Sequence, residues 1–275
     1  MLITLTTDFG LDDVYVATMK GVILGIAPDA SLVDITHTLA PQDIQQAAFV
    51  LWASVPYFPQ PSVHLVVVDP GVGTFRRALA TRTSWGILVG PDNGIFSYVW
   101  ASATTELTVA LESPKFRRAT VSPTFHGRDV FAPAAAYIAS GVSLDELGPH
   151  VQNPVRLPLP ALEVRERSLR GEVIHIDRFG NAITSIGRLV WEGPILHLDP
   201  AFGEGEPRTL NAERVRVVAG DNDVGPIRHT YGVVPVGRPL ALVGSEGLLE
   251  VGVNQGHGAQ ELDLQVGDPV EIRVV

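Results

Sequence analysis

The first half of the chain alternates short apolar runs with longer amphipathic segments. Four runs have the length and composition of buried strands, at residues 2–6, 32–35, 63–68 and 86–89. Two segments between them have helical patterns: residues 12–26, which begin with acidic side chains, and residues 41–55, where Pro41 suits the first helical position. This alternation predicts a three-layer α/β domain with a mainly parallel sheet.

The second half of the chain has a different pattern. A proline-rich stretch with few helix signals indicates a linker at residues 154–168, between an N-terminal domain at 1–153 and a C-terminal domain at 169–275. The C-terminal domain contains short strand-like runs separated by turns, at residues 172–176, 195–198, 214–218, 240–243, 248–253 and 270–275. These runs predict a small antiparallel barrel or sandwich.

Polar side chains follow the predicted strands of the first half. Asp8 comes after the first strand, Asp69 after the third and Asn93 after the fourth. Ligands bind just beyond the carboxyl ends of the strands in open parallel sheets, so we expect these three residues on a common rim. A carboxylate at such a position can accept hydrogen bonds from two vicinal hydroxyls of a ribose. The alternative for Asp8 is a turn or helix-cap aspartate.

Asp69 stands at the end of an apolar run, and a glycine-containing loop then leads to Arg76. An aspartate and an arginine in a partly dry cleft stabilise each other's charged forms. Downstream, His126 brings a side chain that titrates near neutrality. These three residues therefore provide an acid, a base and a positioning charge. The alternatives are a surface ion pair of small energetic value and a structural histidine.

Two polar motifs of the second half combine recognition groups with glycines. The first, at residues 177–181, contains Asp177, Phe179 and Asn181, and the second spans residues 244–256. Such sets can hold a zwitterionic group or a purine. Taken singly, each is also compatible with an ordinary β-hairpin turn.

Composition narrows the partners. The 275 residues carry a net charge of -10, which makes nucleic acid and anionic membrane surfaces poor partners, and no apolar run approaches the roughly 20 residues that span a bilayer. Cysteine is absent, the eight histidines are scattered without zinc-site spacing, and no serine nucleophile elbow occurs. We therefore expect no metal. The first residues lack the features of a signal peptide, so we expect a cytoplasmic protein.

Taken together, these motifs resemble the S-adenosyl-L-methionine hydroxide adenosyltransferase family, relatives of the fluorinases and chlorinases. Ordered motifs covering nearly the whole chain carry the resemblance, at residues 6–10, 34–37, 69–76, 91–94 and 125–129 and in the two C-terminal motifs. The resemblance implies an N-terminal α/β domain, a C-terminal β-barrel domain and a homotrimer with its sites between neighbouring subunits. It implies no cofactor, since S-adenosyl-L-methionine is the substrate.

The resemblance also implies roles for individual residues. Asp69, Arg76 and His126 form the catalytic set that positions and activates water. Asp8 holds the ribose hydroxyls, Asp177 and Ser245 take the methionine end, Phe179 and Asn181 contact the adenosyl group, and the backbone from Val253 lies near the adenine. Further substrate-binding residues are Asp12, Asn93 and Glu250.

The expected reaction is hydrolysis of S-adenosyl-L-methionine to adenosine and L-methionine by in-line attack of water at the ribose C5′. Gln42 stands where the fluorinases have a tryptophan and Glu246 where they have an arginine, which argues against halide use. Three alternatives stay open: a non-catalytic sensor that binds S-adenosylmethionine or adenosine, a 5′-halogenating relative, and a metal-dependent nucleotide phosphohydrolase.

Overall fold

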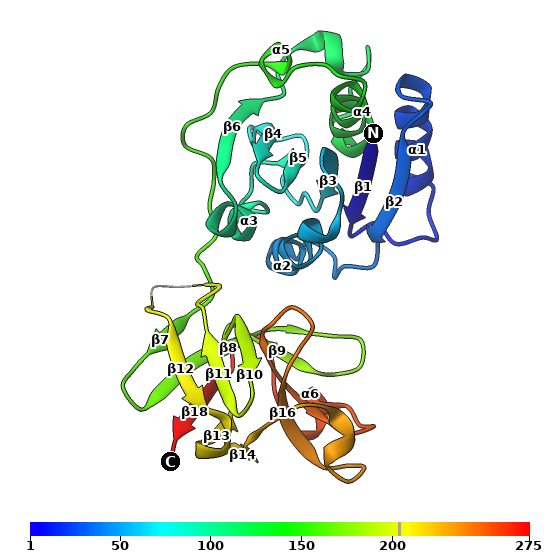
Figure 1. The fold of residues 1–275 in the computed structure, drawn as a ribbon. Coiled ribbons are helices and arrows are strands. Elements are labelled where there is room, and N and C mark those ends of the chain that lie inside the picture. The colour runs from blue at the N-terminus through cyan, green and yellow to red at the C-terminus, as the bar shows by residue number, and fades with distance from the viewer. Residues whose placement is uncertain (203–204) are drawn as a thin grey trace. The chain divides into compact units, whose positions relative to one another are not determined.

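The computed structural model describes residues 1–202 and 205–275, which form two compact units. The first unit is Met1–Pro158 and the second is Leu159–Val275 (Figure 1). Among the described residues, no helix has both the length and the apolar character needed to cross a membrane.

The first unit is built on a six-stranded sheet with the order β2-β1-β3-β5-β4-β6. β2, β1, β3 and β5 run parallel, whereas β4 is antiparallel to both of its neighbours. The prediction of a mainly parallel sheet is therefore confirmed for four strands. The bounds are Leu2–Thr7 for β1, Ser31–Thr36 for β2, Ser62–Val67 for β3, Ala78–Thr83 for β4, Gly86–Pro91 for β5 and Thr105–Ala110 for β6.

Helices cover both faces of this sheet, which completes the three predicted layers (Figure 1). α1 packs on α4, which lies against β3 and β1, while α2 packs on α3. The α-helices are α1 (Tyr15–Ile26), α2 (Ile44–Ser54), α3 (Ser97–Ser102), α4 (Ala132–Ala139) and α5 (Leu144–Leu147). Three shorter helical turns are η1 (Val55–Tyr57), η2 (Pro114–Phe116) and the π-helical turn η3 (Gly127–Phe131).

The two predicted helix starts are wrong. Asp43 caps α2, because its side chain accepts a hydrogen bond from the backbone N–H of Gln46 at 2.8 Å, and Pro41 therefore lies before the helix. α1 begins at Tyr15 and has no acidic residue in its first turn. The acidic residues at 12 and 13 lie in the bend that precedes it.

The second unit is a predominantly antiparallel β domain. Its main sheet has the order β14-β13-β18-β8-β9-β17-β16-β15, with β7 paired to β8, and β10, β11 and β12 form a second sheet. β13 and β14, at one end of the main sheet, lie against β15 and β16 at the other end, so the sheet nearly closes into a barrel. This confirms the predicted β-barrel domain.

The strands of the second unit are β7 (Leu162–Val164), β8 (Ser168–Ile176), β9 (Ala182–Thr184), β10 (Leu189–Glu192), β11 (Ile195–Leu198), β12 (Arg208–Asn211), β13 (Val215–Ala219), β14 (Asn222–Gly225), β15 (Ile227–Arg228), β16 (Pro239–Val243), β17 (Leu249–Val253) and β18 (Pro269–Val274). The helical segments are η4 (Ala212–Arg214), η5 (Tyr231–Val233) and α6 (Gly258–Glu261). β7 lies within residues 154–168, which the sequence suggests as a linker.

The first-unit sheet contains a buried histidine. His64 on β3 is fully buried and lies opposite Thr4 on β1, whose hydroxyl is 2.9 Å from the ring Nδ1. Burial lowers the pKa of His64 to about 4 from its ordinary value of 6.5. The folded protein therefore holds this ring in its neutral form across most of the physiological range.

We predict that His64 makes the first unit acid-sensitive. Between pH 6.5 and pH 4 the unfolded chain binds a proton at this ring that the folded chain does not, so stability falls as the pH falls. The free energy of unfolding should fall by about 3 kcal/mol across this window, at roughly 1.4 kcal/mol per pH unit. Denaturant unfolding at several pH values measures it. His64→Gln should have a shallower slope in this window, and an unchanged slope would contradict the assignment.

Candidate functional site

The carboxyl ends of the parallel strands form a polar rim in the first unit. Asp8 follows β1 and Asp69 lies just beyond β3, and the two residues line one cavity of about 420 Å³. Asn93 follows β5, and its side-chain amide donates to the carbonyl of Val68 at 2.9 Å, next to Asp69. The fold thus places all three predicted residues along the same sheet edge. Asp12 is exposed and does not line this cavity.

Arg76 connects Asp69 with His126. Its Nε donates to both carboxylate oxygens of Asp69, at 2.9 and 3.1 Å, and its Nη2 contacts Oδ2 of the same carboxylate and lies 2.8 Å from His126 Nδ1. The Asp69 and Arg76 side chains are only 5% and 10% exposed, so this is no solvated surface pair. The guanidinium also lies over the ring of Phe131, 5.1 Å from its centroid.

The bond between Arg76 and His126 fixes the tautomer of the histidine. A guanidinium has only donors, so His126 Nδ1 must accept, and the proton of the neutral ring stands on Nε2. Burial, followed by the nearby charge of Arg76, lowers the pKa of His126. The histidine is therefore a neutral ring with its Nε2–H available as a donor.

The loop between Asp69 and Arg76 depends on one glycine. Gly73 has a φ of +76°, and a Cβ at this position would overlap the backbone carbonyl of Pro123. A side chain would therefore be strained and would push the loop away from residues 122–126. The close approach of these two segments brings Arg76 to His126.

Asp129 holds the other segment in place. Its fully buried carboxylate accepts from Arg128 Nε at 2.7 Å and from the backbone N–H of Ser122 at 2.9 Å, and it pairs with Arg118 at 3.1 Å. These contacts fold residues 118–129 into a compact loop that ends in η3. The aspartate of the predicted motif is therefore a structural anchor for His126.

Asp8 is tied to the loop that precedes α2. Its Oδ2 accepts from the backbone N–H of Gln42 at 2.8 Å, and Gln42 adopts a φ of 67°. The other carboxylate oxygen accepts no hydrogen bond from the described residues. Beside it, Phe9, Tyr15 and Phe125 form a cluster of rings with centroids 5.1 to 6.0 Å apart. The sequence reading missed Tyr15, which carries no motif signal.

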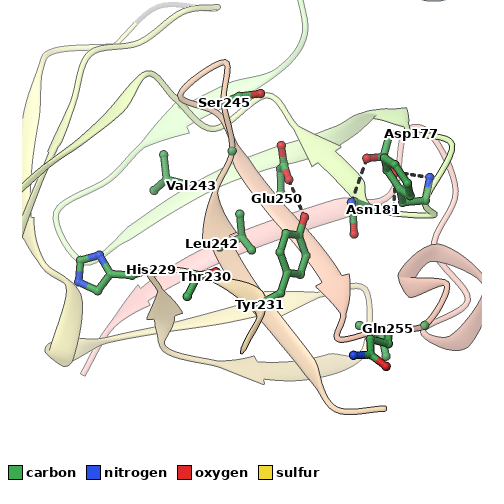
Figure 2. A pocket seen from close by; sticks show the side chains of 14 residues that line it. Asp177, Asn181, His229, Thr230, Tyr231, Leu242, Val243, Ser245, Glu250 and Gln255 are labelled. Atoms are coloured by element: carbon green, nitrogen blue, oxygen red, sulfur yellow. Dashed lines mark hydrogen bonds between the residues drawn. The ribbon is translucent and has the colours of Figure 1, made fainter. Parts of the chain in front are cut away.

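The second unit has its own pocket, of about 760 Å³ (Figure 2). It brings together all six site residues predicted in this half: Asp177, Phe179, Asn181, Ser245, Glu250 and Val253. Further residues that no sequence motif marked also line it, among them His229, Thr230, Tyr231, Leu242 and Val243. Residues far apart in the chain thus converge because β8, β9, β17 and β16 are neighbours in one sheet.

Asp177 organises the turn after β8. Its Oδ1 accepts from the backbone N–H groups of Phe179 and Asn181 at 2.9 and 2.8 Å, and its Oδ2 accepts from the Asn181 side-chain amide at 2.9 Å (Figure 2). The Phe179 ring is left 76% exposed. Asp177 therefore fixes a turn conformation in which the Phe179 ring is exposed and the side-chain amide of Asn181 is held in one orientation.

Glu250 is a buried acid at the pocket wall. Tyr231 donates its hydroxyl to Glu250 Oε2 at 3.1 Å (Figure 2), and a Cβ on Gly244 would overlap the same carboxyl group. Burial, together with the negative charges of Glu246 and Asp177, raises the pKa of Glu250 to about 7. Burial and Glu250 in turn raise the pKa of Tyr231. Tyr231 begins the short helical turn η5, and no sequence motif marks it.

The turn between β16 and β17 is polar. Ser245 is exposed, and its hydroxyl donates to Glu246 Oε1 at 2.9 Å. Val253, at the end of β17, is buried.

The pocket lining within the described residues includes no lysine or arginine. Across the same part of the chain, no cluster of three or more His, Asp or Glu side chains is suited to a metal ion.

We predict that Glu250 makes stability fall toward alkaline pH. Its folded-state pKa lies above the ordinary 4.5, so its stabilising contribution is complete below pH 4.5 and is lost as the pH rises through about 7. Glu250→Gln should therefore gain thermal stability relative to wild type at pH 8, and the gain should shrink at pH 5. Thermal unfolding across this range measures the difference. A difference that stays constant with pH would refute the buried-acid assignment.

Comparisons with known proteins show which family both units belong to. Residues 3–148 match the SAM hydroxide adenosyltransferase N-terminal domain, and residues 171–271 match the C-terminal domain of the same family. A protein of Thermus thermophilus named (R)-S-adenosyl-L-methionine hydrolase is 43% identical over 97% of both chains. A fluorinase of Nocardia brasiliensis is 26% identical over 99% of this chain and 97% of its own.

A solved structure shares the fold over the whole length. The crystal structure of an uncharacterized conserved protein from Thermotoga maritima superimposes with a TM-score of 0.86 and 32% sequence identity, covering 99% of this chain and 100% of that one. The two domain matches and the full-length similarity cover both units described above. The chain belongs to the SAM hydroxide adenosyltransferase family.

Proposed function

We propose that this protein hydrolyses S-adenosyl-L-methionine to adenosine and L-methionine, using water as the nucleophile. The observation that carries the proposal is the hydrogen-bonded set of Asp69, Arg76 and His126 beside the cavity that Asp8 and Asp69 line. The family membership and the named hydrolase of Thermus thermophilus support the choice of substrate. Following that name, we propose that the (R) epimer at sulfur is the one consumed.

In this mechanism the water oxygen attacks the ribose C5′ in line with the C5′–S bond. The bond electrons go to sulfur, which becomes a neutral thioether, so the leaving group needs no proton. The protein must supply alignment and a more nucleophilic water, and alignment alone contributes up to about 7 to 11 kcal/mol in intramolecular reactions. A positive charge beside the water favours its hydroxide character.

Arg76 and Asp69 have the geometry for these tasks. Arg76 Nη1 makes only a long contact of 3.4 Å, to the carbonyl of Arg77, so it is the guanidinium nitrogen best placed to hold the water. His126 Nδ1 is occupied by Arg76 and its Nε2 carries the proton, so His126 orients the guanidinium and donates rather than accepts. We therefore assign the proton of the attacking water to Asp69.

The remaining predicted residues are retained as substrate contacts. The unoccupied oxygen of Asp8 suits a ribose hydroxyl, and Asn93, next to Asp69, is assigned to the same rim. In the second unit we assign Phe179, Asn181 and the Val253 backbone to the adenosyl group. Asp177, Ser245 and Glu250 are assigned to the methionine part. Asp12 is kept as a further substrate-binding residue on the strength of the resemblance.

The pocket of the second unit suits a positively charged ligand. It is lined by the acids Asp177 and Glu250, with Glu246 close by, and its described lining holds no lysine or arginine. A substrate with a sulfonium and an ammonium group matches such an environment. We also propose, from the resemblance, a homotrimer in the cytoplasm, which sedimentation and cell fractionation would test.

We predict that the purified protein, incubated with S-adenosyl-L-methionine in oxygen-18 water containing chloride, yields adenosine labelled at the 5′ oxygen together with methionine. Mass spectrometry of the products measures this outcome, and a substrate mixture of both sulfur epimers should leave the (S) form behind. A 5′-chlorinated nucleoside would instead indicate a halogenating enzyme. Intact substrate bound tightly to the protein would indicate a sensor.

We predict that Arg76→Ala lowers kcat by about 100-fold or more, because positioned charges at the reacting atoms contribute on this scale. KM should change much less, since Arg76 is assigned to the water and not to the substrate. His126→Asn should lose less, because its amide oxygen can still accept from Arg76. Steady-state kinetics of the two variants, with substrate binding by calorimetry, separates these effects. Unchanged turnover in Arg76→Ala would disprove the assignment of this residue.

A further inference from the structure

A second cavity of the first unit lies away from the residues assigned above. Its volume is about 570 Å³, and three guanidinium groups line it, those of Arg117, Arg118 and Arg128. The rest of the lining comes from α1, through Thr18, Gly21, Val22, Gly25 and Ile26, and from Pro133 of α4. None of the proposed catalytic or substrate-binding residues takes part in this lining.

The arginines outnumber the acids around this cavity. Asp129 pairs with Arg118 at 3.1 Å and with Arg128 at 2.7 Å, but its side chain is fully buried beneath them and also accepts from the Ser122 backbone. Asp129 thus compensates two of the arginines at most in part, and no ion pair is formed by Arg117 within the described residues, which leaves a local excess of positive charge in a chain whose net charge is -10. Such an excess attracts anions.

Arg117 is the cation without an acidic partner. Its Nε is buried and has no hydrogen-bond partner among the described residues. A buried donor without an acceptor costs free energy, and native proteins rarely leave one unsatisfied. Arg128, in contrast, is fixed by Asp129 and by the ring of Phe125, which lies 5.0 Å below its guanidinium carbon.

The cavity is open along α1 because two of the lining residues of this helix, Gly21 and Gly25, have no side chain. A Cβ built on Gly21 or on Gly25 would have no heavy atom within 4 Å. The space in front of the arginines is therefore free, and it is bordered by the apolar Val22, Ile26 and Pro133.

We propose that this cavity binds a small molecule carrying a phosphate group, with Arg117 as its principal ligand. Phosphoryl oxygens accept from guanidinium groups in paired, charge-assisted hydrogen bonds, and several arginines around one opening are the usual means of holding them. No carboxylate among the described residues pairs with Arg117, so the guanidinium that it brings to the cavity can donate to the phosphate oxygens. The solvent-facing edges of Arg118 and Arg128, whose side chains are 49% and 34% exposed, would add further donors.

The charge of this cavity acts on His126, one of the three proposed catalytic residues. The positive charge of Arg117 contributes, after burial and Arg76, to lowering the pKa of His126. An anion bound at Arg117 would offset that charge, so the pKa of His126 should rise on binding. Binding of a phosphorylated compound in this cavity would thus change the pKa of His126, the residue that orients Arg76.

Calorimetric titration of the full-length protein with pyrophosphate at low ionic strength tests the proposal. Wild type should bind, and Arg117→Gln should bind about 10-fold more weakly or worse. Gly25→Leu should also lose binding, because its side chain fills the cavity while every charge remains, and a helical glycine tolerates this change without loss of stability. Arg165→Gln is the matched control, since it removes an exposed arginine paired with Glu163 at 2.7 Å.

Two outcomes would overturn the proposal. Pyrophosphate could fail to bind wild type at millimolar concentration, or Arg117→Gln and Gly25→Leu could bind it as wild type does. In the first case, a changed sedimentation coefficient of Arg117→Gln would assign Arg117 to a contact between subunits. NMR titration of the His126 ring provides an independent readout, because its pKa should rise with pyrophosphate in wild type and stay unchanged in Gly25→Leu.

Discussion

The site of the first unit depends on one guanidinium group held between an acid and a histidine. Arg76 compensates the charge of Asp69, and its Nη2 can only donate, which forces His126 to remain a neutral acceptor at Nδ1. A single side chain therefore pairs with the carboxylate of one neighbour and fixes the tautomer of the other. Because Asp69 and Arg76 are nearly inaccessible to solvent, water screens this arrangement only weakly.

The fold around Arg76 serves to bring two distant segments together. β3 ends at the sheet edge and delivers Asp69, and Gly73 then permits the close approach to residues 122–126 that any side chain would prevent. On the other side, Asp129 pairs with Arg118 and Arg128 and holds the segment that carries His126. The contact between Arg76 and His126 thus depends on Gly73, which has a left-handed conformation, and on the buried carboxylate of Asp129.

The sequence was informative where a local pattern coincides with burial. Continuous apolar runs predicted β1, β3 and β5 closely, and the polar residues after them predicted the rim. β4 was missed because Ala and Thr dilute its apolar pattern. The start of α2 was misplaced because Asp43 caps the helix, so Pro41 lies before it and not at its first position. Tyr231 could not be found, because its role arises from the tertiary contact with Glu250.

The acidic residues of the two units have different neighbours, and this difference affects what each unit can bind. Asp69 has a guanidinium beside it, whereas Glu250 is buried against a tyrosine and near two other acids, so its pKa rises to about 7. Near neutrality Glu250 is therefore partly protonated, and an approaching cation would favour its ionised form. A positively charged ligand would thus pull the proton from Glu250 as it binds, which couples the acidity of this pocket to its occupancy.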